Sequence, residues 1–515
     1  MAGDPSVSLN STNAAKVSVE FIPQDLAYVI INAIHERHGG VFDAYVDLMH
    51  GELSEHIYAA VILLVDMYLE SKPHRSYIGW QALSGNKLKR LFSSKSEPYA
   101  LFRSGLILES KAEYSKKNGI CMGARLYPEE RATIAEVFES YPANLGDAVL
   151  VNHKGEPYKS NHIGRTPYGK NKPLKISNLP DFTPINGEAI RVAIKHIRLW
   201  LVGGHTKPHP VDLQPRLTLE LEAKRDEYQR KNKDNAQTEF ESYLQRVVGH
   251  LEYLLLFAAT GVPHSLKMSH SGRVYGAILH NLPRVVRKVA LHGFTSFDFD
   301  ACHHRIFQAR ASELDIPTPV LDEYLLDKAG TRAQIADEIN VTVDQAKQAL
   351  IAVAYGARLR RKSYNRESAL LSILGADAYD RAENHAVFSG LITEMRNVGA
   401  HWVDSALRRR NKKTERVYQI NCRGLPLPVT GDDGEVVKLS SRVAHLVQGV
   451  ESAMLKTAVA AHANKKTMGS KVVLTLHDGW ICRLPCNEST AADAVQKRFG
   501  ICVPVNSELY DLIDL

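Results

Sequence analysis

The sequence predicts an α+β fold in which a mainly helical N-terminal domain precedes a domain of mixed strands and helices. Apolar residues recur at helical spacing in 25–37 and 55–69, which indicates amphipathic helices early in the chain. Two apolar, strand-like runs at 291–297 and 472–476 lie far downstream, with helical patterns between them. A chain of 515 residues is also too long for one hydrophobic core.

Composition limits the classes of partner and the compartment. The formal net charge of +7 favours a polyanionic partner, either nucleic acid or an acidic membrane surface. No apolar run approaches the roughly 20 residues of a membrane helix. The polar stretch 1–16 has no apolar signal core, so we expect a cytoplasmic protein with no membrane partner. Six cysteines without a Cys-x-x-Cys pair predict reduced thiols and no structural zinc.

We expect four regions along the chain. They are a flexible arm at 1–20, a mainly helical domain at 21–205, a linker with a charged helix at 206–240, and a second domain at 241–515. In the first domain, a basic helix at 80–91 and a hairpin with an Asn-Gly turn at 116–119 suggest a winged-helix-like module that binds nucleic acid. A plain helical domain with a solvated hairpin is the alternative.

The most informative stretch is the strand end at Asp298. The run 291–297 alternates like a strand, and a helical pattern follows from about Ile306. A carboxylate fixed at a strand end, with backbone oxygens free in the next turn, suits a divalent metal. Asp300 is the rival ligand, and a surface strand end with ordinary solvated aspartates is the alternative reading.

A second carboxylate interrupts the other apolar run. Asp478 lies between the runs 472–476 and 480–482, at a hairpin tip where a plain Asp-Gly turn is the alternative. Two aspartates at strand ends can form a two-metal site for phosphoryl transfer. We predict that Asp298, Asp478 and the backbone of Phe299 hold two Mg²⁺ ions, for which Mn²⁺ can substitute.

Cationic residues lie between these two carboxylates in the sequence. Gly272 and Arg273 combine a tight turn with a guanidinium that can bind phosphate. Lys347 and Tyr355 share one face of a predicted helix, which can hold a triphosphate and a base together. Further predicted contacts to nucleic acid are Arg284, Arg287, Arg358, Arg360 and Arg361.

Two other readings of this helix stay open. It can be an ordinary amphipathic helix with one solvated lysine. With the preceding helical pattern at 332–339 it also resembles a helix-turn-helix, which would suit a protein that reads an operator.

In this order the motifs resemble those of the single-subunit polymerases, which are the family A DNA polymerases and the phage and mitochondrial RNA polymerases. The string 272–275 resembles the Gly-Arg motif of the RNA polymerases, and 298–305 resembles motif A. Lys347 with Tyr355 and Gly356 has the spacing of motif B, and His477-Asp478 is similar to motif C. Gln448-Gly449 is similar to the Gln-Gly step before motif C, so the resemblance covers about 240–515.

The resemblance implies a right-hand polymerase domain. The palm would span about 265–307 and 421–515, and the fingers about 308–420. Lys347 would act with Asp298 and Asp478 in catalysis. Residues expected to bind the nucleotide are Lys347, Tyr355, Gly356, His303 and Arg273, and Gln448 and His477 are expected to contact nucleic acid.

The chain departs from the family pattern at several positions. Ser269 replaces the Asp that leads the Gly-Arg motif, and Val343 replaces the Arg four residues before the motif B Lys. Ile351 stands where the DNA polymerases have a Phe. His303 replaces the Glu that serves them as ribose gate, and the missing carboxylate favours ribonucleotides.

These observations predict a template-dependent nucleotidyltransferase. Its expected partners are a nucleic-acid template, with DNA favoured, and NTPs or dNTPs. We favour a compact single-subunit DNA-directed RNA polymerase or primase of a phage or mobile element, which would act in the cytoplasm of a bacterial host. The alternatives are a family A-like DNA polymerase without proofreading and a non-catalytic nucleic-acid-binding protein built on a degenerate palm.

Overall fold

A computed structural model defines the fold. It describes residues 22–38, 46–47, 52–53, 55–69, 81–83, 108–111, 122–141, 149–152, 154, 157, 182–202, 214–231, 235–263, 266–276, 278–357, 369–411, 414–431, 434–463, 472–476, 478–483 and 486–515.

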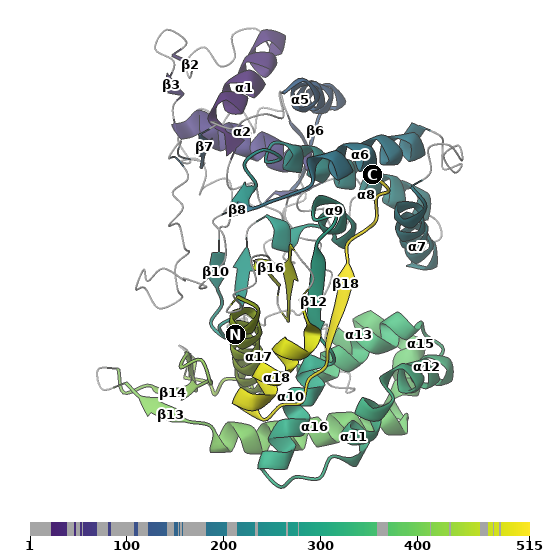
Figure 1. The fold of residues 1–515 in the computed structure, drawn as a ribbon, viewed down its shortest axis with the longest axis vertical. Coiled ribbons are helices and arrows are strands. Elements are labelled where there is room, and N and C mark those ends of the chain that lie inside the picture. The colour runs from purple at the N-terminus through teal and green to yellow at the C-terminus, as the bar shows by residue number, and fades with distance from the viewer. Residues whose placement is uncertain are drawn as a thin grey trace.

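The described helices and strands follow one another along the chain as labelled in Figure 1. The α-helices are α1 (Gln24–His38), α2 (Glu55–Tyr68), α5 (Pro128–Ser140), α6 (Gly187–Val202), α7 (Pro215–Lys231), α8 (Ala236–Leu255), α9 (Arg284–Ala290), α10 (Cys302–Glu313), α11 (Pro319–Leu326), α12 (Lys328–Glu338), α13 (Val343–Ala354), α14 (Ala369–Leu374), α15 (Ala376–Glu383), α16 (Ala386–Ser405), α17 (Leu439–Ala463) and α18 (Glu488–Phe499). The strands are β1 (Ile22–Pro23), β2 (Val46–Asp47), β3 (Glu52–Leu53), β4 (Gln81–Leu83), β5 (Leu108–Lys111), β6 (Met122–Leu126), β7 (Leu150–Val151), β8 (Phe182–Thr183), β9 (Val262–Pro263), β10 (Leu266–Met268), β11 (Val274–Gly276), β12 (Thr295–Phe299), β13 (Arg408–Arg410), β14 (Val417–Ile420), β15 (Pro426–Pro428), β16 (Val472–Thr475), β17 (Gly479–Cys482) and β18 (Val505–Leu509).

A four-stranded antiparallel sheet carries the predicted site. Its strand order is β16-β17-β12-β18, so β12 lies between two neighbours that follow it by more than 170 residues. Along β12 the side chains of Phe297 and Phe299 are buried while Asp298 between them is exposed, as a strand with a period of two requires. The strand and the hairpin predicted from sequence are therefore both present.

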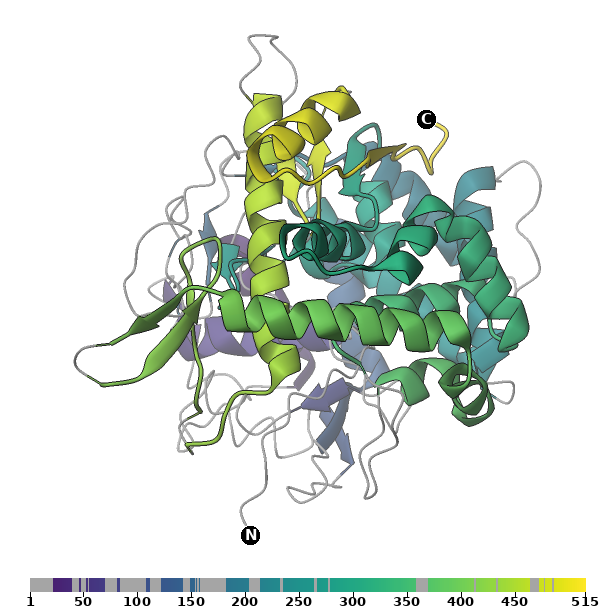
Figure 2. The ribbon, with the colours of Figure 1, turned by 90° about the horizontal axis from the view of Figure 1, so that it is seen from below.

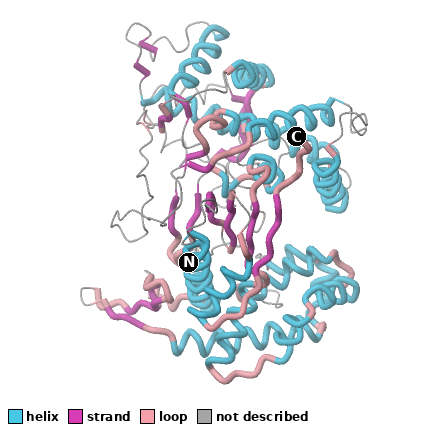
Figure 3. Tube along the Cα trace, viewed as in Figure 1, coloured by secondary structure: helices cyan, strands magenta, loops and turns pink. Residues whose placement is uncertain are grey.

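The sheet separates two hydrophobic cores. One core contains side chains from α1 to α9 and reaches the sheet through Val473, Leu474 and Ile481. The other contains side chains from α10 to α18 and reaches the sheet through Phe297 and Trp480. In Figure 1 the helices of the first core lie above the central strands, and most of those of the second core lie below. Figure 3, coloured by secondary structure, shows the central strands between these two groups of helices.

In the first half of the chain the helices predicted at 25–37 and 55–69 are confirmed as α1 and α2. The helix predicted at 80–91 is wrong at 81–83, which form β4 at one edge of the sheet β4-β6-β5. Pairing of β4 with β6 therefore outweighs the local helical pattern there. The expected arm at 1–20 and the hairpin turn at 116–119 lie outside the described residues.

The segment expected to contain a charged helix forms α7, which packs against the first hydrophobic core. Leu217 and Leu221 on this helix are fully buried in the first core. Lys288 of α9 pairs with Glu220 of α7 and with Glu508 of β18, so α7 is also tied to the edge of the central sheet.

In the second half, long helices cover one face of the sheet and a small sheet projects from them. Figure 2 shows α16 crossing α17, with β13 and β14 extending away from the helices. Strand β13 consists of three exposed arginines, Arg408–Arg410. Within the residues that the structure describes, no helix has both the length and the apolar character that a membrane span needs.

Candidate functional site

Strand pairing brings Asp298 and Asp478 together. Asp298 is paired across the sheet with Gly479, the residue after Asp478. The backbone N–H of Phe299 donates to the carbonyl oxygen of Asp478 at 3.1 Å, and the two carboxyl groups share a hydrogen bond. Two carboxylates separated by 180 residues of sequence thus lie side by side, as predicted.

The pKa of Asp298 is raised by partial burial and by the neighbouring carboxyl group of Asp478. The side chain is open to solvent on one side, yet the surrounding protein partly strips its hydration, which is the first cause of a raised pKa. The charge of Asp478 and the hydrogen bond with it raise the pKa further, and Lys347 only partly offsets them. The pKa of Asp298 rises from 3.8 to about 8. Two hard oxygen donors that lie side by side in this way fit a site for Mg²⁺.

This pair predicts an unusual pH dependence of stability without metal. A carboxyl whose folded pKa lies above its unfolded pKa stabilises the fold at low pH, and that contribution is lost as pH rises through the folded value. In the presence of a chelator, we expect the free energy of unfolding to fall between about pH 4 and pH 8, and Asp298→Asn to remove most of this slope. Urea unfolding at a series of pH values measures it, and an equal slope in both proteins would contradict it.

Asp300, the rival metal ligand, is occupied elsewhere. Its carboxylate forms an ion pair with Lys328 of α12, and its N–H donates to the carbonyl oxygen of Pro504 at 2.9 Å. The next residue, Ala301, adopts a left-handed conformation with φ of 50°, which turns the chain sharply from β12 into α10. This geometry favours Asp298 over Asp300 as the metal ligand.

Gly479 is required by the close approach of β17 to β12. A Cβ at this position would overlap the backbone oxygen of Phe297 and touch the Asp298 carboxylate. We expect Gly479→Ala to push the hairpin away, to lower the free energy of unfolding by about 1–3 kcal/mol, and to remove activity. Urea unfolding and nucleotide incorporation measure the two effects. Wild-type activity in this variant would show that the carboxylate spacing is unimportant.

Helix α13 faces the carboxylates with one mixed surface. A capping box between Thr342 and Gln345 starts the helix. Lys347 is exposed and close enough to Asp298 to lower its pKa, and Ile351 one turn later is 37% exposed. Gly356 ends the helix at φ of 79° and packs against Ser440 of α17. A cation and an exposed apolar side chain therefore lie on one face beside the acidic pair.

The turn that carries Arg273 is fixed from below by α17. Gly272 has a φ of 101°, and its carbonyl oxygen accepts a hydrogen bond from Ser452 Oγ at 2.5 Å. Ser269 stands where the resemblance has an Asp, and its hydroxyl accepts the N–H of Arg273 at 3.1 Å. These contacts hold the Arg273 backbone rigidly above the helix.

A partly buried polar network joins Arg273, His303, Tyr355 and Glu451. Arg273 donates to Glu451 Oε2 from Nε at 3.0 Å and from Nη2 at 2.5 Å, and also to the Tyr355 hydroxyl at 2.5 Å. His303 Nε2 lies 3.0 Å from Glu451 Oε2 and 2.8 Å from the Tyr355 hydroxyl. Three residues predicted to bind nucleotide therefore converge on a fourth that the sequence did not reveal.

Glu451 is the member that sequence reasoning missed. Its side chain is 0% exposed on α17, and its Oε1 atom has no hydrogen-bond partner among the described residues. Burial alone would raise its pKa, but His303 and Arg273 hold the pKa of this carboxyl below its ordinary value. The sequence does contain a sign that Glu451 is buried. Val447, Glu451 and Met454 follow helical spacing, so this acid lies on the apolar face of its helix.

Other predicted contacts lie apart from this centre or outside the described residues. Arg284 is exposed and bonds both carboxylate oxygens of Glu508 at 3.1 Å, and Arg287 is half-buried on the same helix, α9. Gln448 is half-buried on α17, one turn from Glu451. The positions outside the described residues are Arg358, Arg360, Arg361 and His477.

Comparisons with known proteins identify no family. No family model matches the chain, and no curated protein matches it. Among solved structures the chain is similar to the POL domain of Pol1 from M. smegmatis in complex with DNA primer-template and dNTP. That similarity has a TM-score of 0.42 and 14% sequence identity, and it covers 64% of this chain and 68% of the other. A similarity at this level does not indicate a function.

Proposed function

We propose that this protein is a template-dependent nucleotidyltransferase whose active centre is the Asp298–Asp478 pair. The observation that carries the proposal is the pairing of β12 with β17, which sets Asp298 beside Asp478, with Lys347 close enough to lower the pKa of Asp298. Structural aspartates on a sheet are rarely forced together in this way, whereas a site for divalent cations needs such a pair. When bound, two Mg²⁺ ions would supply Lewis-acid activation of a hydroxyl and stabilisation of the departing pyrophosphate.

The residues of this chain would then bind and orient the nucleotide. Lys347 lies close enough to Asp298 to lower its pKa, and it would neutralise charge that develops on the phosphates. The exposed side chain of Ile351 lies one turn further along α13 and offers an apolar surface to a base. The Tyr355 hydroxyl and the His303 imidazole lie next to each other, and these hydrogen-bonding groups would contact the sugar of the nucleotide.

We infer that an RNA polymerase or primase is the better subtype, because His303 replaces the acidic ribose gate expected from the resemblance. One observation favours a DNA polymerase as the second candidate. Glu451 of α17 contributes a carboxylate to the network of Arg273, His303 and Tyr355. This carboxylate could replace the ribose-gate Glu that the DNA polymerases have at the position of His303.

One experiment tests the reaction and the subtype together. The protein is incubated with single-stranded DNA or RNA, with and without primer, with Mg²⁺ or Mn²⁺, and with either NTPs or dNTPs. The proposal requires products whose composition follows the template. Products that ignore template identity would indicate untemplated addition, and the absence of any product from wild type would favour a non-catalytic binding protein.

A further inference from the structure

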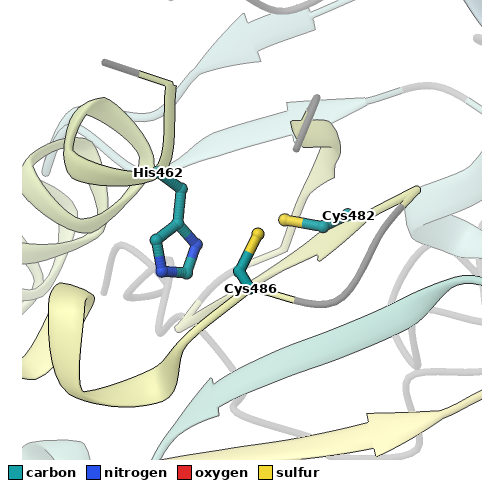
Figure 4. A group of neighbouring side chains, drawn as sticks. All are labelled: His462, Cys482 and Cys486. Carbon is teal, nitrogen blue, oxygen red and sulfur yellow. The ribbon is translucent and has the colours of Figure 1, made fainter. Parts of the chain in front are cut away.

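Three potential metal ligands meet at the end of β17 that lies away from the carboxylate pair. They are His462 in the last turn of α17, Cys482 at the end of β17, and Cys486 just before α18. One ligand atom from each lies within 4.8 Å of the other two, and Figure 4 shows the two sulfurs and the ring facing one another. None of these residues takes part in the proposed reaction.

Hydrogen bonds fix the tautomer of His462, so that Nδ1 carries the lone pair and Nε2 carries the proton. The indole N–H of Trp480 can only donate, and it reaches His462 Nδ1 at 3.0 Å, so Nδ1 is the acceptor. Nε2 therefore carries the proton, and it lies 3.2 Å from the carbonyl oxygen of Asn487, to which it donates. A ring whose second nitrogen donates to a backbone carbonyl is the usual arrangement of a metal-binding histidine. In Figure 4 the ring nitrogen of His462 that is nearer the two sulfurs is Nδ1, the nitrogen bonded to Cγ.

Trp480 keeps a partner when a cation replaces it at Nδ1. Its indole N–H is also in hydrogen-bonding contact with Cys482. A metal on Nδ1 would leave that N–H to donate to the Cys482 sulfur, so no buried donor is orphaned. The ring centroids of Phe297 and Trp480 lie 5.5 Å apart in a stacked pair, and those of Phe297 and His462 lie 5.4 Å apart. These ring contacts help to hold the His462 ring in its orientation.

We propose that His462 Nδ1, Cys482 Sγ and Cys486 Sγ bind one thiophilic divalent cation of the Zn²⁺ class. Two sulfurs and one imidazole are soft and borderline ligands that select Zn²⁺ over Mg²⁺. Binding releases the two thiol protons to solvent, so the cation and two thiolates form a neutral unit. Water fills the fourth position. The cation would join α17, β17 and α18. This proposal departs from our expectation of no structural zinc, which considered only Cys-x-x-Cys spacing.

Metal content and thermal stability test this site independently of catalysis. Apoprotein is reduced, exchanged into chelator-free buffer and titrated with Zn²⁺, or with Co²⁺ as a spectroscopic probe. We expect one tightly bound Zn²⁺ per chain, thiolate-to-cobalt charge-transfer absorption, and a Tm raised by several degrees. Cys486→Ser should lose the absorption and most of the Tm rise, and His462→Gln provides a second variant.

The exposed Cys502 provides the matched control, because Cys502→Ser should bind the metal as wild type does. The proposal fails if reduced wild type binds no Zn²⁺, or if Cys486→Ser and His462→Gln bind it as tightly as wild type. It also fails if thiol titration finds Cys482 and Cys486 joined in a disulfide that persists in reductant. Because Asp298→Asn leaves this site intact, retained Zn²⁺ binding in that variant separates the proposal from the catalytic one.

Discussion

Asp298→Asn should lower the rate of nucleotide incorporation by about 10³-fold or more while leaving nucleic-acid binding nearly unchanged. The amide keeps the size of the side chain but removes the negative charge that would hold a divalent cation next to Asp478. In our proposal, contacts to a nucleic-acid backbone would come from cationic side chains elsewhere, so the affinity for nucleic acid should depend little on Asp298. Primer extension with saturating nucleotide measures the first effect, and a binding titration at fixed salt measures the second.

Three further variants make this test specific. Asp478→Asn should have a similar effect, and the double variant should be little worse than either single one, because the pair acts as a unit. Asp300→Asn is the matched control, since the Asp300 carboxylate is already paired with Lys328. A larger loss from Asp300→Asn than from Asp298→Asn would move the metal site to Asp300. Equal loss of binding and incorporation in Asp298→Asn would argue against a catalytic role.

Glu451→Ala should lower the free energy of unfolding by about 3–5 kcal/mol, which is the cost of removing one partner from a buried ion pair. Arg273 is only 11% exposed and would lose its carboxylate partner, and His303 would lose its contact with the same carboxylate oxygen. Urea unfolding monitored by circular dichroism measures this loss.

The control for Glu451 is Glu313, an exposed acid paired with Arg310. Glu313→Ala should change the free energy of unfolding by no more than about 1 kcal/mol. Glu451→Gln keeps the shape of the side chain, so it should fold and should change the preference between NTPs and dNTPs. An unaltered preference together with wild-type stability would mean that the network has no part in reading the sugar.

Local patterns in the sequence were sufficient for the elements that carry the site. Alternation identified β12, an Asp-Gly turn between apolar runs identified the β16–β17 hairpin, and helical spacing with a terminal glycine identified α13. These signals are short in range, because each depends on neighbouring residues of one element. The juxtaposition of Asp298 and Asp478 was predicted from the resemblance between motifs as well as from the strand ends.

Contacts between distant segments were beyond such reasoning. Glu451 appeared as one acid in a long helix, and only the fold places it under Arg273 and His303. The cluster of His462 with two cysteines was overlooked for the same reason, because its spacing in sequence matches no short zinc motif. The helix expected at 80–91 failed where strand β4 found a partner in β6.

The position of β12 in the middle of the sheet has a consequence for how the chain folds. Both neighbours of β12, β17 and β18, are made more than 170 residues later, so this apolar strand leaves the ribosome with two unpaired edges. Closing such long loops is slow, and exposed strand edges promote association with other chains. Synthesis at low temperature, or with chaperones that cover exposed strands, should therefore increase the yield of soluble protein.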